Sequence, residues 1–134
     1  MIDVTLNGII TLTRGDNATI PLVISDCDPL YPEQTRYELK GDDAVYFGVM
    51  FPNQDFKNAV IRKKYTKEDM TEDFEIPIRF EPEDTENLPK GDYYYEIKLK
   101  KDNEEVKEVT TIVEKTIFYL IDWGVSDGWI ARKN

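Results

Sequence analysis

The sequence predicts an all-β protein, an immunoglobulin-like β-sandwich of about seven to nine strands. Residues 74–80 alternate apolar and polar side chains, and residues 93–99 do so again. A period of two with charge on one side is typical of a strand with one buried and one solvated face. The acidic connection between them, residues 81–92, is too long for a tight hairpin. We therefore expect the chain to change sheets between these two strands.

The remaining strands follow from short β-prone runs separated by polar connectors. They are expected at residues 4–6, 9–13, 18–24, 44–51, 59–65, 106–113 and 115–121, and the strand that contains residues 93–99 is expected to span residues 91–101. Asn7-Gly8 is a favoured two-residue turn between the first two. Pro21 cannot donate to a strand ladder, which predicts an edge strand or a bulge. Residues 44–51 are apolar on both faces, which indicates a central strand, and residues 81–88 suit at most a short helical turn.

Residues 25–43 form the longest stretch without a clear period, and we expect a surface loop there. Long loops in compact domains are more often functional or ordered by a partner than incidental. Tyr31 and Tyr37 are therefore candidate partner-binding residues. Asp26 and Asp28 are interpreted as turn formers in preference to calcium ligands, because no loop with EF-hand spacing follows them.

The C-terminal residues 122–134 contain both tryptophans, Trp123 and Trp129. Tryptophan is enriched where surfaces are buried against partners, so this segment is a candidate interaction tail. The alternative is that the tail folds back and caps its own sandwich. At 134 residues, the whole chain from 1 to 134 is expected to be a single domain with one core.

The charge of the chain narrows the classes of partner. The formal net charge of −10 argues against nucleic acid, because neutralising a phosphate backbone takes clustered lysine and arginine. The short basic run at residues 62–64 is expected to be a solvated strand face. No apolar run approaches the length of a membrane span, and the N-terminus lacks the pattern of a signal peptide. We expect a protein made in the cytoplasm, without a membrane partner.

The composition also removes most catalytic chemistry. The chain has no histidine and a single cysteine, Cys27, so it lacks the residues for His-dependent nucleophilic catalysis, a disulfide framework or a structural zinc site. Its seven glycines form no phosphate-binding loop. A pair of carboxylates in a cleft remains an open alternative, as in a glycosidase, although 27 acidic residues produce close pairs by chance. We expect no enzyme, no cofactor and no metal.

Two short motifs concern turns. A glycine at Gly91 followed two residues later by Tyr93, at the start of a long strand, matches the layout of a tyrosine corner. The Tyr93 ring is expected to be buried, with its hydroxyl returned to the backbone near residues 84–87. Residues 14–16 spell Arg-Gly-Asp, which is either a turn between strands, the favoured interpretation, or the integrin-binding tripeptide.

Three segments in order, residues 12–20, 46–50 and 88–97 with 109–113, combine an Arg-Gly-Asp turn before a strand with a Gly-x-Tyr-x-Tyr strand and a threonine-rich return strand. This order resembles β-sandwich proteins of phages and prophages of Gram-positive bacteria. The resemblance is nearest to the N-terminal domain of the upper baseplate protein of lactococcal siphophages. It spans roughly residues 5–121.

The resemblance implies a non-catalytic virion structural protein of the baseplate, the tail or another accessory part of the particle, assembled in the host cytoplasm. Its partners would be other virion proteins, and a homo-oligomer is left open. Members of the family usually continue into a coiled coil or a further domain, whereas the sequence here stops at Asn134. The alternative function is a carbohydrate-binding or adhesive module, with Tyr31, Tyr37, Tyr94, Trp123 and Trp129 as candidate stacking residues.

Overall fold

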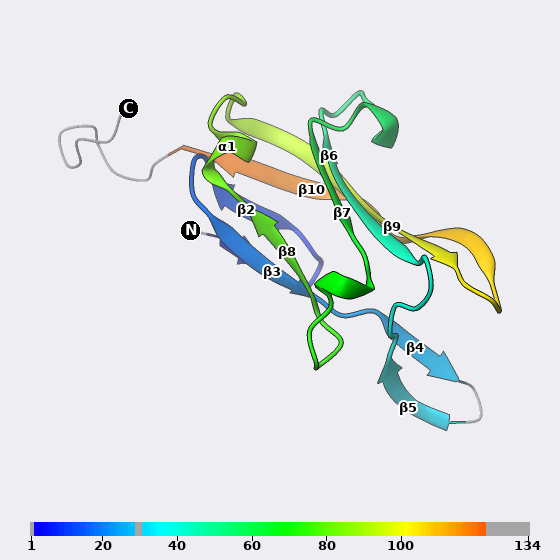
Figure 1. Ribbon diagram of the computed structural model, residues 1–134. Helices are drawn as coiled ribbons and strands as arrows, with labels where there is room; N and C mark the ends of the chain where they lie inside the picture. Colours follow the sequence, from blue (N-terminus) through cyan, green and yellow to red (C-terminus); the bar gives the residue numbers. More distant parts are fainter. Residues whose placement is uncertain (1, 29–30, 123–134) are drawn as a thin grey trace.

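The computed structural model describes residues 2–28 and 31–122, which form ten strands, one short α-helix and two 3₁₀ turns (Figure 1). The strands are β1 (Ile2–Val4), β2 (Ile10–Thr13), β3 (Ala18–Leu22), β4 (Ser25–Asp28), β5 (Tyr31–Arg36), β6 (Ala44–Met50), β7 (Ile61–Tyr65), β8 (Ile76–Phe80), β9 (Gly91–Asp102) and β10 (Lys107–Ile121). The helical elements are α1 (Pro82–Thr85), η1 (Phe56–Asn58) and η2 (Lys67–Asp69). The predicted all-β, sandwich-like fold is confirmed, with somewhat more strands than expected.

Six strands form one curled sheet in the order β1-β2-β10-β9-β6-β7. It is mixed, because β10 runs parallel to β2 and every other neighbouring pair is antiparallel. The antiparallel ribbon β3-β8 forms a second layer across it, and the β4-β5 ribbon extends from one end (Figure 1). The chain leaves the second layer after β8 and enters the large sheet at β9, as the long acidic connection predicted.

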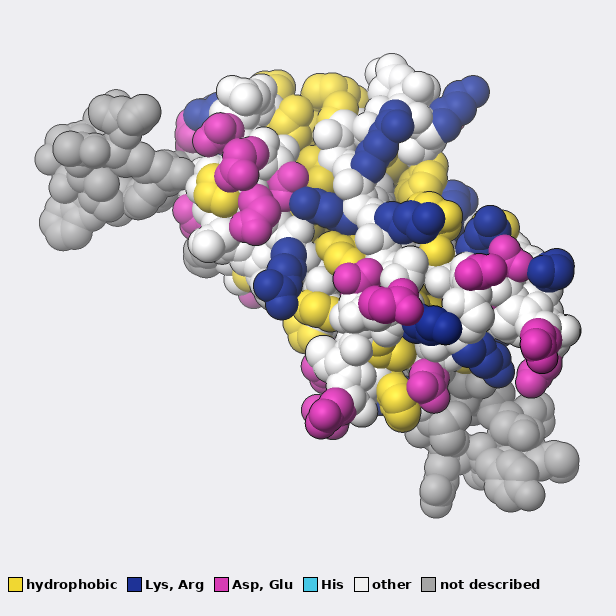
Figure 2. All heavy atoms as spheres, viewed as in Figure 1, with side chains coloured by type: hydrophobic (Ala, Val, Ile, Leu, Met, Phe, Trp, Pro, Cys, Tyr) yellow, Lys and Arg dark blue, Asp and Glu magenta, His cyan; other side chains and the backbone are white. Residues whose placement is uncertain are grey.

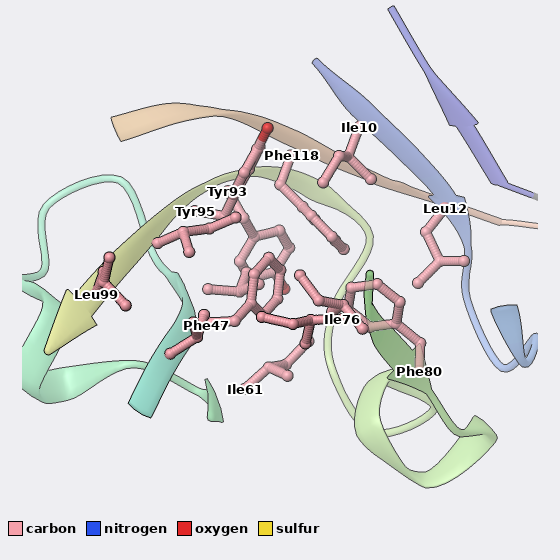
Figure 3. Close-up of a cluster of buried hydrophobic side chains, with 14 of the residues drawn as sticks. Ile10, Leu12, Phe47, Ile61, Ile76, Phe80, Tyr93, Tyr95, Leu99 and Phe118 are labelled. Atoms are coloured by element: carbon pink, nitrogen blue, oxygen red, sulfur yellow. The ribbon is translucent and has the colours of Figure 1, made fainter. Parts of the chain in front are cut away.

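The apolar core lies between the large sheet and the β3-β8 ribbon (Figure 3). Phe47 of β6 and Phe80 of β8 meet edge to face, with their ring centroids 5.5 Å apart. Phe80 also approaches Phe118 of β10 at 5.8 Å. Because these rings come from both layers, their burial holds the layers together, and each ring contributes on the order of 3 kcal/mol.

Local sequence signals explain several of these elements. Gly8, in the turn between β1 and β2, has a φ of 83°, a conformation that glycine adopts without the strain of a side chain. Pro21 of β3 stands opposite Pro77 of β8 in a two-stranded ribbon. Each strand there has an unpaired side, so neither missing N–H weakens the ladder. Residues 44–51, predicted as a central strand, form β6, which lies between β7 and β9. The helical turn predicted at residues 81–88 is α1.

Two predictions of local structure are wrong. Residues 25–43 are not one loop, because β4 and β5 pair as a hairpin. Backbone hydrogen bonds between the two strands form this ribbon. The prediction missed it because it relied on alternation of apolar side chains, which this segment does not show. Residues 106–113 and 115–121 are not two strands either, because β10 runs through both. Irregularities in its pairing with β9 between Thr111 and Thr116 absorb the break in alternation.

Candidate interaction surface

The side chain of Tyr93 is buried at the start of β9, and its hydroxyl donates a 2.5 Å hydrogen bond to the carbonyl oxygen of Pro89. The acceptor therefore lies four residues upstream, closer than the predicted residues 84–87. Burial raises the pKa of Tyr93 above its ordinary value, against a smaller lowering effect of Arg14. The hydroxyl stays protonated at neutral pH and can keep donating. Tyr95 is buried too, and its hydroxyl donates to the carbonyl oxygen of Gly8.

The structure places Tyr37, a predicted partner-binding residue, in the core with an exposed fraction of 7%. Its hydroxyl donates to the carboxylate of Asp43, which is itself buried. The ammonium groups of Lys40 and Lys101 lie over its ring at 5.9 and 4.7 Å. A ring buried in this way offers little area to a partner, so the structure argues against Tyr37 as a contact residue. The sequence missed this burial because the surrounding segment shows no period.

The other predicted contact residues are placed only in part. Tyr31 is the first residue of β5 and stands opposite Asp28 in the hairpin register, while its side chain is not among those described. Trp123 and Trp129 lie outside the described residues. The interaction-tail prediction for residues 122–134 therefore stays a prediction.

The Arg-Gly-Asp segment forms a turn that ties three parts of the fold together. The Arg14 guanidinium donates to Asp122 Oδ1 at 2.8 Å and to the Leu88 carbonyl oxygen at 3.3 Å. The backbone N–H of Gly15, whose φ is 83°, donates to the Thr85 hydroxyl at 2.8 Å. Because the arginine is held by contacts within the chain, this geometry favours the structural interpretation of the motif.

An open depression of about 290 Å³ lies beside the start of β3 and the end of β8. It is lined by Asn17, Ala18, Thr19, Arg79, Phe80 and Glu81. Glu81 is the one carboxylate among these lining residues. A carboxylate-pair mechanism needs two such groups, so this depression does not supply the chemistry of a glycosidase.

The residues that the structure describes contain no group of three or more His, Cys, Asp or Glu side chains arranged to hold a metal ion. None of the helices in residues 2–28 and 31–122 has the length and apolar character needed to cross a membrane.

The outer face of the large sheet, turned away from the core, carries a different set of side chains. Val45, Phe47 and Val49 of β6 point into the core, so the alternate residue Tyr46 points outward. Strand register places Lys64 of β7 and Lys98 of β9 directly beside Tyr46. The neighbouring rows contribute Arg62 with Gly48 and Glu96, and Lys100 with Ala44 and Val109. We call Tyr46, Arg62, Lys64, Lys98 and Lys100 the basic face.

A 3₁₀ turn completes the basic face. A Cβ added to Gly48 would lie 2.9 Å from Cε1 of Phe56, so the missing side chain lets the Phe56 ring of η1 pack directly on β6. The ammonium of Lys98 lies 5.2 Å from the centre of that ring, and the ammonium of Lys64 lies 5.8 Å from the centre of the Tyr46 ring. Such cation–π contacts hold a charged side chain flat on an aromatic surface.

Sequence reasoning described residues 62–64 only as a solvated strand face. That description holds for Arg62 and Lys64, which are exposed, whereas Lys63 points to the other face and forms a 2.6 Å ion pair with Asp84. The spacing of two between Lys98 and Lys100 likewise indicates that these lysines share one face of a strand. Only the strand register shows that these two pairs of cations share one face.

The chain matches no protein-family model and no curated protein sequence.

Proposed function

We propose that this protein is a non-catalytic structural component of a phage particle, in the baseplate, the tail or another accessory part, and that it acts through protein–protein contacts. The order of sequence segments over residues 5–121 resembles that of phage β-sandwich domains. This resemblance supports the proposal that the protein is part of a phage particle. The sandwich-like fold agrees with that resemblance.

One observation carries the proposal of a contact function. The basic face has four cations, Arg62, Lys64, Lys98 and Lys100. Glu96 is the one carboxylate in the same rows of the sheet, and Asp102 lies 3.9 Å from Lys100 beyond them. This concentration of positive charge occurs on a chain whose net charge is −10. Aromatic residues and arginine are enriched at surfaces that bind a protein partner, and surface charge there directs binding toward a partner of opposite charge.

The experiment is to ask whether the protein belongs to a particle. Particles are purified on a density gradient from the source organism after prophage induction, and their proteins are identified by mass spectrometry. We expect this chain to sediment with capsid and tail proteins in a constant ratio. A chain found only in the soluble fraction, while particles form normally, would contradict the proposal.

The tail provides a second test. We expect deletion of residues 122–134 to leave a folded domain and to weaken assembly into the particle. Circular dichroism measures folding and gradient sedimentation measures assembly. Because Asp122 bonds to Arg14, deletion of residues 123–134 alone is the matched control that keeps this ion pair. If the control variant unfolds, the tail belongs to the core and is not an interaction segment.

A carbohydrate-binding module is the second candidate. Tyr46 and Tyr94 both lie on the outer face and are partly exposed, so their rings offer surfaces on which a sugar could stack. A glycan array separates the two functions. Binding to a defined glycan that is lost in Tyr46→Ala and Tyr94→Ala would favour this candidate, whereas an array without hits favours the structural function.

A further inference from the structure

We propose that the basic face binds the acidic corner of a second copy of this chain. We define the acidic corner by the exposed residues Glu81, Glu83 and Glu86, at and beside α1. This inference deepens the proposed function, because it names the first partner as another copy of the protein. It is tested on the purified protein alone.

Two of the four cations of the basic face, Arg62 and Lys64, carry charge that the described part of the chain does not neutralise. Within the described residues, no carboxylate lies at salt-bridge distance from Arg62 or Lys64. Arg62 instead donates to the carbonyl oxygens of Lys57 and Ala59, at 2.7 and 3.0 Å, which fixes its guanidinium at the edge of the sheet. Lys98 approaches Glu96, and Lys100 approaches Asp102, each only at 3.9 Å. Arg62, Lys64 and Lys98 are therefore positioned by contacts within the chain before any partner arrives.

The acidic corner has the opposite excess. Asp84 of α1 is neutralised by Lys63 and also accepts the backbone N–H of Glu81. In the part of the chain that the structure describes, Glu83 and Glu86 have no lysine or arginine at salt-bridge distance. Figure 2 shows Asp and Glu side chains gathered over α1, and Lys and Arg side chains over β7 and η1.

Charge complementarity favours a second copy whose acidic corner docks on the basic face. Two copies with a net charge of −10 each repel one another in most orientations. Docking that places the basic face against the acidic corner converts this repulsion into attraction, and like charges oppose the other arrangements. The ring of Tyr46, at the centre of the four cations, supplies apolar area to the middle of the contact.

The test is self-association measured by sedimentation velocity over a series of protein concentrations, at about 20 mM and about 500 mM salt. We expect association at low salt that is lost at high salt, because ionic strength screens charges at a surface. Reversal of the basic face in Lys64→Glu/Lys98→Glu, or of the acidic corner in Glu83→Lys/Glu86→Lys, should each weaken association at least about tenfold.

Mixing the two variants in equal amounts should restore association, since the reversed faces are again complementary. The matched control is Lys40→Glu/Lys67→Glu, which changes the net charge as much as Lys64→Glu/Lys98→Glu does and alters two exposed lysines outside both areas. It should associate like the unaltered protein apart from a small general effect. Circular dichroism verifies that every variant is folded.

A protein that stays monomeric at low salt overturns this inference, and so does association that both reversed variants retain. Failure of the mixture to restore association overturns it as well. None of these results touches the particle proposal, which sedimentation of the chain with purified particles tests separately.

Discussion

The hydroxyl of Tyr37 donates a 2.6 Å hydrogen bond to Oδ2 of Asp43, and both side chains are buried. The same carboxylate accepts the backbone N–H groups of Lys40 and Asp102, at 3.1 and 2.6 Å, and the side-chain amide of Asn103 at 3.0 Å. One carboxylate therefore joins the segment before β6 to the turn between β9 and β10. A buried charge is stable in this position because its oxygens receive four donors.

Replacing Asp43 should destabilise the fold strongly. In Asp43→Ala, four donors lose their acceptor in a buried site, and each unsatisfied group costs about 1–3 kcal/mol. We expect the free energy of unfolding to fall by about 3 kcal/mol or more, measured by urea denaturation. Tyr37→Phe is the control, since it removes one donor and should cost only about 1 kcal/mol. Equal losses in the two variants would contradict the network.

Asp43 should also make stability depend on pH. Burial of the carboxyl raises its pKa. The hydrogen bonds from Tyr37, Asp102, Lys40 and Asn103 together lower the pKa by more than burial raises it, so the pKa in the folded protein lies below the ordinary value. Its stabilisation is therefore fully present above the unfolded-state pKa and is lost as pH falls through the folded-state pKa. We expect the stability difference between the unaltered protein and Asp43→Asn to shrink below about pH 4, measured by urea denaturation at several pH values. A constant difference would exclude Asp43 as the source.

Removing the hydroxyl of Tyr93 should cost less than removing its ring. Tyr93→Phe loses the hydrogen bond to Pro89 and should reduce the free energy of unfolding by about 1 kcal/mol. Tyr93→Ala leaves a cavity in the core and should cost about 3–5 kcal/mol. Thermal unfolding measures both variants. If Tyr93→Phe is neutral, the hydroxyl does not hold the turn before β9.

The close contact between Gly48 and Phe56 predicts a coupled pair. In Gly48→Ala, the new methyl group meets the Phe56 ring at 2.9 Å and the ring must move off the sheet, at a cost of about 1–3 kcal/mol. With Phe56→Ala already present, the contact with the ring is gone and only the Cβ of Ala59 stays close, at 3.2 Å, so the same substitution should cost less. A double-mutant cycle by urea denaturation measures the coupling. Additive effects would show that the ring does not depend on this glycine.

Sequence patterns alone predict most of the strands, the change of sheets between residues 80 and 91, and the short helical turn at α1. The physical reason is local: period-two alternation, turn residues and acidic residues at a helix start act within a few positions of one another. The β4-β5 hairpin escaped this reasoning because only the pairing of two backbone segments creates it.

Which polar and aromatic side chains are buried, and which share a surface, depends on the folded arrangement of the strands. Tyr37 and Asp43 lie in a stretch without a period, yet donors from a turn about sixty residues away make their burial stable. Lys64 and Lys98 are far apart in sequence, and strand register places them on either side of Tyr46. Burial and surface charge depend on contacts between distant segments, which a pattern along the chain does not contain.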